Sequence, residues 1–166
     1  MEKTARLYTF NYNEALTYLW ATAFIVCNLL LPQLFHLIPQ GGVIFSPLSF
    51  VILVGAYKFG WKTGLLAALL SPLVNHWLTG MPTMAVLPVM TLKLAVLALV
   101  AGLTAQHFKK ATLPLLLGVI LVTKVIGGLG EWLLTGGIAA TIADFTIGWP
   151  GLLIQLFGAW LILKRA

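Results

Sequence analysis

The stretch that decides the fold is MAVLPVMTLKLAVLALVAGLTAQHFKK, residues 84–110. Its apolar part is long enough for a helix that crosses the hydrocarbon core of a bilayer, which takes about 20 residues. It contains a single charged side chain, Lys93, and it ends in Lys109 and Lys110. A long apolar run that ends in lysines is typical of a transmembrane helix whose basic end faces the cytoplasm.

The composition of the whole chain extends this interpretation. Of the 166 residues, 60% are hydrophobic and 8% are charged, whereas a soluble domain carries about 25% charged residues. A soluble globule this apolar could not cover its surface with polar groups. No polar stretch is long enough for a second domain. We therefore expect an all-α integral membrane protein, with residues 1–166 forming a single transmembrane domain.

Gaps rich in glycine, proline or lysine divide the chain into six apolar runs. We expect the gap PQGGVIFSP, residues 39–47, to be a loop without helix; the alternative is that the second helix starts earlier, near Val43. Pro150 is expected in the first turn of the last helix, where proline is tolerated, with 137–147 as a loop or short re-entrant helix; the alternative is one long helix kinked at Pro150. The six transmembrane helices are predicted at about 14–38, 48–57, 63–78, 84–106, 112–134 and 149–163, after a cytoplasmic arm at 1–13.

Basic residues alternate between these gaps. The gaps 39–47, 79–83 and 135–140 contain no lysine or arginine. Because cytoplasmic loops are enriched in basic residues, the alternation predicts that both termini are cytoplasmic. The net charge of +6 is then a topology signal beside anionic lipid, and we expect no nucleic-acid partner. The basic residues of the arm, the inner gaps and the tail are Lys3, Arg6, Lys58, Lys62, Lys109, Lys110, Lys164 and Arg165.

Several polar side chains lie within the apolar runs or beside their outer ends. A charge at the bilayer centre costs about 3 kcal/mol on the insertion scale, so it normally faces a partner or a wet cavity. The predicted topology brings these groups to one level, the outer half of the membrane, and we expect a pocket for a small molecule there. The predicted substrate-binding residues are Asn75, His76, Lys93, Lys124, Glu131, Trp132, Asp144 and Trp149.

A purely structural role for the same charges is the alternative. In that case Lys124 would pair with Glu131, and Lys93 with Asp144, to hold the helices together. The glycines of GGLG, residues 127–130, allow two interpretations as well. Small residues permit close helix packing, and missing side chains also leave room for a ligand.

Motifs for catalysis or metal binding do not emerge from the sequence. The three histidines are far apart, and Cys27 is the sole cysteine. The GxxxxGK[ST] motif that binds ATP does not occur in the sequence. We expect no cofactor and no enzymatic activity. A small polytopic enzyme acting on a lipid or lipid-linked substrate, and a ligand-free assembly protein, remain the alternative functions.

The layout of the chain resembles a known family, the substrate-binding S components of energy-coupling factor (ECF) transporters for vitamins and related micronutrients. The resemblance rests on the six short spans, on residues 38–82, and on GEWLLTG (130–136) and DFTIGWPGLLIQLFG (144–158). It implies a high-affinity binding subunit in a bacterial cytoplasmic membrane that holds its ligand in the outer half of the bundle.

The resemblance also implies partners. An S component docks on a transmembrane coupling protein that is driven by two cytoplasmic ATPases, so the transport energy comes from those partners. Its first helix carries a small-xxx-small docking pattern, commonly AxxxA. The matching positions here are Thr17-x-x-x-Ala21 and Ala23-x-x-x-Cys27, which depart from that pattern. We expect Thr17, Ala21, Ala23 and Cys27 to form the docking face.

Overall fold

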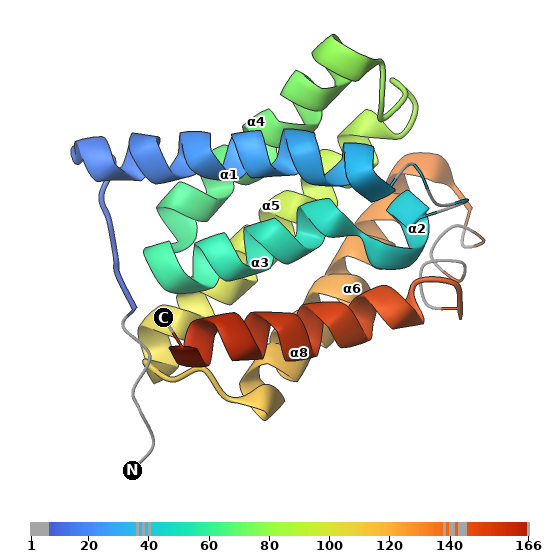
Figure 1. The fold of residues 1–166 in the computed structure, drawn as a ribbon. Coiled ribbons are helices and arrows are strands. Elements are labelled where there is room, and N and C mark those ends of the chain that lie inside the picture. Colours follow the sequence, from blue (N-terminus) through green and yellow to red (C-terminus); the bar gives the residue numbers. More distant parts are fainter. Residues whose placement is uncertain are drawn as a thin grey trace.

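The fold is that of a computed structural model, which describes residues 7–35, 37, 39, 41–137, 139, 142 and 146–165. Every regular element in these residues is a helix, and six of the helices are 13 to 23 residues long. Figure 1 shows them side by side in a bundle. The helices are α1 (Ala15–Phe35), α2 (Gly41–Phe45), α3 (Pro47–Phe59), α4 (Trp61–Thr79), α5 (Leu87–Phe108), α6 (Leu113–Thr135) and α8 (Trp149–Arg165).

Prolines and glycines set the helix boundaries. Helices α3, α5 and α6 each have a proline in their first two positions, where the missing N–H has no intrahelical partner to lose. Helices α4 and α6 end at Gly80 and Gly136, with φ of 73° and 70°. These left-handed conformations favour glycine. Pro150 lies in the first turn of α8, as its position in the sequence predicts, so the alternative of one helix kinked there is wrong.

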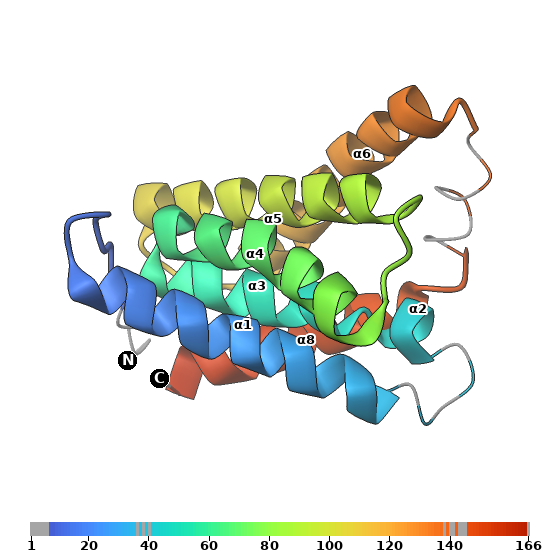
Figure 2. The ribbon, with the colours of Figure 1, turned by 90° about the horizontal axis from the view of Figure 1, so that it is seen from above.

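The bundle has two layers. Helices α1, α3 and α8 form one layer and α4, α5 and α6 the other, with α3 packed on α5 at the centre (Figures 1 and 2). Alanines allow the layers to approach closely, because Ala56, Ala67, Ala98 and Ala101 are all fully buried. The fully buried Tyr57 adds a tie, since its hydroxyl donates a hydrogen bond of 2.5 Å to the carbonyl of Lys110.

The two ends of the bundle differ in charge. At one end, on the left in Figure 1, α3, α5 and α8 finish and α4 and α6 begin. We call it the basic end, and the opposite one, where α2 lies, the pocket end. The basic end carries Lys58, Lys62, Lys109, Lys110, Lys164 and Arg165.

Three of the described helices are long and apolar enough to cross a membrane: α1, α5 and α6. This finding, with the all-helical fold, is consistent with the expected membrane protein. One local expectation is wrong: the 39–47 gap contains the five-residue helix α2. Two glycines at its start did not prevent a helical turn, because α2 packs against α8.

Candidate functional site

A cavity of about 480 Å³ opens within the pocket end of the bundle. Its volume falls within the range of about 300–1,000 Å³ that is usual for small-molecule sites. Residues from all six long helices contribute to it, and most of its wall is apolar. Its charged residues are Lys93, Lys124 and Glu131. The uncharged polar residues that line it are Gln33, Ser46, Ser49, Asn75, Thr79, Thr123 and Gln155, of which Asn75, Thr123 and Gln155 are buried.

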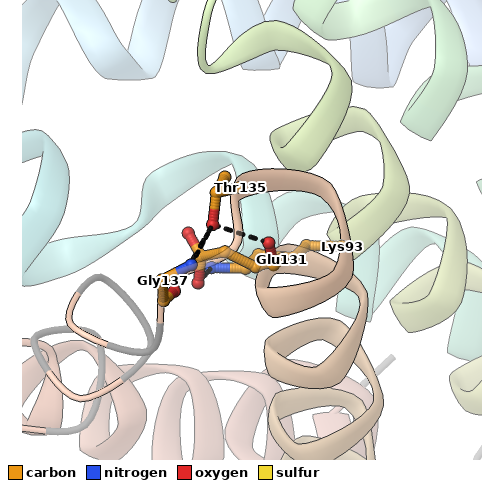
Figure 3. Close-up of polar contacts among 4 residues, drawn as sticks. All are labelled: Lys93, Glu131, Thr135 and Gly137. Carbon is orange, nitrogen blue, oxygen red and sulfur yellow. Dashed lines mark hydrogen bonds and ion pairs between the residues drawn. The ribbon is translucent and has the colours of Figure 1, made fainter.

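An ion pair between α5 and α6 forms part of the cavity wall. The Lys93 Nζ lies 2.8 Å from Glu131 Oε2, and the two side chains are 25% and 9% exposed (Figure 3). Burial leaves little water to screen the charges, so each depends strongly on its partner. The structure pairs Lys93 with Glu131. The sequence suggested Asp144 as the partner of Lys93 and Lys124 as the partner of Glu131. Asp144 lies outside the described residues.

The last turn of α6, which carries Glu131, also contains Thr135. Thr135 Oγ1 donates a hydrogen bond of 2.8 Å to the carbonyl of Glu131, and it accepts one of 3.4 Å from the N–H of Gly137 (Figure 3). The Thr135 side chain thus ties the last turn of α6, which carries Glu131, to the backbone just beyond the helix.

Asn75 reaches the cavity from α4. It is 4% exposed, and its Nδ2 donates hydrogen bonds of 2.9 Å to the carbonyls of Asn28 and Ser71. Both amide protons are therefore in use, so the amide offers the cavity only its oxygen as an acceptor. The Asn28 amide in turn donates to Ser71 Oγ at 3.0 Å, and this network joins α1 to the helix that carries Asn75.

The glycines of α6 agree with both interpretations of the GGLG sequence, which are close helix packing and space for a ligand. A Cβ on Gly127 would lie 3.0 Å from Lys93 Cγ, and a Cβ on Gly130 would lie 2.5 Å from Leu92 Cδ2. These glycines therefore let α6 approach α5 closely. Gly127 and Gly128 also line the cavity, so their missing side chains leave space within it.

Three of the predicted site residues lie away from the cavity wall. His76 Nδ1 contacts the carbonyl oxygen of Pro82 at 2.7 Å, which fits a histidine that ties a turn. Trp132 and Trp149 are 49% and 58% exposed. Both tryptophans fit the aromatic belt at a membrane interface better than a stacking role in the cavity.

Two buried polar residues of the cavity wall were missed by sequence reasoning. Thr123 precedes Lys124 on α6, and Gln155 is the one strongly polar side chain in the middle of α8. Gln155 could have been identified, because a polar residue inside an apolar helix commonly faces a partner or cavity. Threonine gives no such signal, since its hydroxyl is usually satisfied by the helix itself.

The predicted docking residues separate into two pairs. Thr17 and Ala21 are 0% and 4% exposed, and Thr17 Oγ1 donates a hydrogen bond of 2.5 Å to the carbonyl of Asn11. Both residues belong to the interior of the bundle, so they are not available to a partner in this structure. Ala23 and Cys27 are exposed.

Comparisons with protein-family profiles, with curated proteins and with solved structures find no match to this chain. Within the part of the chain that the structure describes, no three histidine, cysteine, aspartate or glutamate side chains are grouped so that they could hold a metal ion. The arguments on function therefore rest on the cavity and on the sequence.

Proposed function

We propose that the chain is the membrane-embedded substrate-binding subunit of an ECF-type, ATP-driven uptake transporter for a vitamin or related micronutrient. The observation that carries the proposal is the cavity of about 480 Å³, walled by six helices and furnished with charged and amide side chains. A few polar groups placed in an apolar wall are typical of sites that orient a small molecule. A ligand-free assembly protein has no need of such a space.

The proposed membrane disposition follows from the contrast between the ends. The basic end would lie at the cytoplasmic surface, since it collects lysine and arginine. The cavity would then open toward the outside of a bacterial cytoplasmic membrane. All six long helices would cross the bilayer. α1, α5 and α6 are long and apolar enough by themselves, and α3 at 13 residues would be shielded from lipid by its neighbours.

The proposed partners are a transmembrane coupling protein and two cytoplasmic ATPases. Ala23 and Cys27 are small, exposed and one turn apart on α1, which would let another helix approach closely. Thr17 and Ala21 are left out of the proposed docking face, because the fold already buries them.

The ligand itself provides the test of the proposal. Mass spectrometry of small molecules released from the purified full chain should reveal one micronutrient-like compound. Adding this compound back should raise the melting temperature, because a ligand that binds only the folded protein stabilises it by mass action. A protein that carries no small molecule, and that no vitamin stabilises, would contradict the proposal.

Docking has a separate test in transport assays. Ala23→Trp and Cys27→Trp should abolish uptake and leave ligand binding intact, because they alter only an exposed face. Ala21→Trp is the matched control, and overpacking at this buried site should lower stability by about 1–3 kcal/mol. Normal uptake by both exposed variants would show that the partner uses another surface.

A further inference from the structure

The side-chain amide of Asn75 is held in one orientation. Its Nδ2 donates hydrogen bonds of 2.9 Å to the carbonyls of Asn28 on α1 and Ser71 on α4. The Asn28 carbonyl has no helical donor, because Pro32 lies four residues later inside α1 and lacks the N–H that would bond to it. Turning the Asn75 amide end for end would place its oxygen against two carbonyl oxygens. The nitrogen and the oxygen of this amide therefore cannot exchange places.

The amide oxygen of Asn75 is the part of the side chain that remains for the cavity. It accepts no hydrogen bond from another described residue. It is also not sealed in the interior, in contrast to the Thr123 hydroxyl and the Asn28 amide oxygen, which are buried and unpaired among the described residues. Asn75 lines the cavity and is 4% exposed, so the cavity is the space that reaches this oxygen.

The charged residues of the cavity lie on other helices than Asn75. Lys93 is on α5 with its Nζ 2.8 Å from Glu131 Oε2, and Lys124 is on α6 with Glu131. The helix of Asn75, α4, packs on α1, α3 and α5, whereas α6 packs on α5 and α8 (Figure 1). Asn75 and the charges of α6 therefore belong to separate parts of the wall. One ligand can meet the charges with one part and Asn75 with another.

A fixed acceptor selects for a donor. Without a ligand, water can donate to such an oxygen, and a ligand that displaces the water must supply an N–H or O–H to replace the bond. Gln155 also lines the cavity, but its amide makes no hydrogen bond to another described residue. The Gln155 amide can therefore turn to present either its oxygen or its nitrogen. Asn75 is the residue that distinguishes a donor from an acceptor.

We propose that the Asn75 amide oxygen selects ligands that carry an N–H or O–H group on the edge that faces α4. This inference rests on the proposed function, because it takes the cavity to be a small-molecule site. It adds a requirement on the ligand that is independent of the ligand's charge. Whichever group meets the lysines, the edge at Asn75 must offer a hydrogen-bond donor, which an ether, a carboxylate or an N-methylated group does not.

Three probes of similar shape test the inference. Benzimidazole carries a ring N–H, benzoxazole has an oxygen in place of this group, and N-methylbenzimidazole has a methyl group in place of the proton. Their binding to the full chain in lipid nanodiscs is measured by ligand-observed NMR, with empty nanodiscs as the correction for partition into lipid. The unmodified protein should bind benzimidazole about tenfold more tightly than benzoxazole, the ratio expected when a buried acceptor loses its donor. The methylated probe should bind no more tightly than benzoxazole.

Variants then locate the preference within the cavity. Asn75→Leu replaces the amide by an apolar group of similar shape, so the preference for benzimidazole should disappear. Asn28→Leu is the matched control, because it removes another buried asparagine side chain from the same network between α1 and α4. Asn28 is not part of the cavity wall, and its backbone carbonyl still accepts the bond from Asn75. Folded Asn28→Leu protein should keep the full preference.

Several results would overturn the inference. Equal or tighter binding of benzoxazole, or no detectable binding of benzimidazole, would show that the cavity does not select for a donor. A preference that survives in folded Asn75→Leu, or that is lost equally in folded Asn28→Leu, would show that Asn75 is not the selecting residue. The first two results need only the unmodified protein, so they apply even where a variant fails to fold. None of them touches the proposed function, which fails only on the micronutrient test above.

Discussion

The two ends of the bundle use the same kinds of residue in opposite ways. At the basic end, lysines lie at the surface beside aromatic rings, and Lys62 Nζ donates to Asn11 Oδ1 at 2.6 Å in an exposed contact. At the pocket end, Lys93 is drawn inward to Glu131 across two helices. A lysine in water gains little from a partner, whereas a buried lysine requires one. The difference in burial therefore separates the two kinds of lysine. An exposed lysine contributes to the charge of its end of the bundle, and a lysine drawn out of water becomes part of the cavity wall through its ion pair.

The basic end is also closed by the N-terminal arm. The N–H of Tyr8 donates to the carbonyl of Lys58 at 2.7 Å, and the rings of Tyr8, Phe10 and Trp20 pack around Phe59. Local contacts of this kind leave no space for a ligand among these rings. The pocket end, by contrast, joins helices through a few polar contacts around an open volume.

The largest expected effect concerns which side of the membrane each end faces. A reporter fused after Ala166, next to the basic end, should be active only if it functions in the cytoplasm, because cytoplasmic segments of membrane proteins are enriched in lysine and arginine. A second reporter inserted at Gly136–Gly137, next to the cavity, should be active only outside. Activity of the first fusion outside the cell would contradict the six-span arrangement.

Most of the helical framework could be predicted from the sequence. Pro47, Pro114 and Pro150 mark helix starts, and Gly80 and Gly136 mark ends, because these residues act through the local backbone alone. Helix α2 could not be predicted, since it forms within a glycine-rich gap and depends on packing against α8. Local rules give no information on such a contact between distant segments.

The candidate site was predicted in part, for a related reason. Depth along each helix brought Asn75, Lys93, Lys124 and Glu131 to one level, and all four line the cavity. Depth does not give rotation about the helix axis, so Trp132 was assigned to the site although it is 49% exposed. Nor does it give partners, so the ion pair between Lys93 and Glu131 across two helices was not predicted.

The next prediction compares one lysine from each end. Lys93→Met leaves the Glu131 carboxylate buried without this partner, and unfolding in detergent should show a loss of about 3 kcal/mol, the low end for a broken buried pair. Lys62→Met removes an exposed contact to Asn11 and should cost less than about 1 kcal/mol. Equal losses at both positions would contradict the contrast between the ends.

The double variant Lys93→Met, Glu131→Gln is the control for this prediction. It removes both charges, so no stranded carboxylate remains, and stability should recover to within about 1 kcal/mol of the unmodified protein. Ligand affinity separates structure from function here. A structural pair would leave affinity unchanged in the double variant, and a binding pair would lower it about 30-fold or more.

A smaller effect is expected from the helix contact that closes the pocket end. A Cβ on Gly151 would overlap the carbonyl oxygen of Ile44, because α8 and α2 touch there through their backbones. Gly151→Ala should therefore cost about 1–3 kcal/mol and shift α2 at the cavity edge. Gly118→Ala on α6 is the control, since a Cβ there meets nothing within 4 Å. A neutral Gly151→Ala would indicate that α2 does not pack tightly on α8.

The smallest expected effect separates the aromatic residues of the two ends. Trp20 stacks on Phe59 at the basic end with ring centroids 4.2 Å apart, whereas Trp132 at the pocket end is 49% exposed. Trp20→Leu should cost about 1 kcal/mol, because an aromatic pair contributes that much beyond the area it buries. Trp132→Leu should change the unfolding free energy by less than about 0.5 kcal/mol, as surface substitutions usually do. It should also leave ligand affinity unchanged, because its ring lies outside the cavity wall. A loss of affinity in Trp132→Leu would show that this tryptophan contacts the ligand, and that the binding site extends to the end of α6 beyond the cavity wall described above.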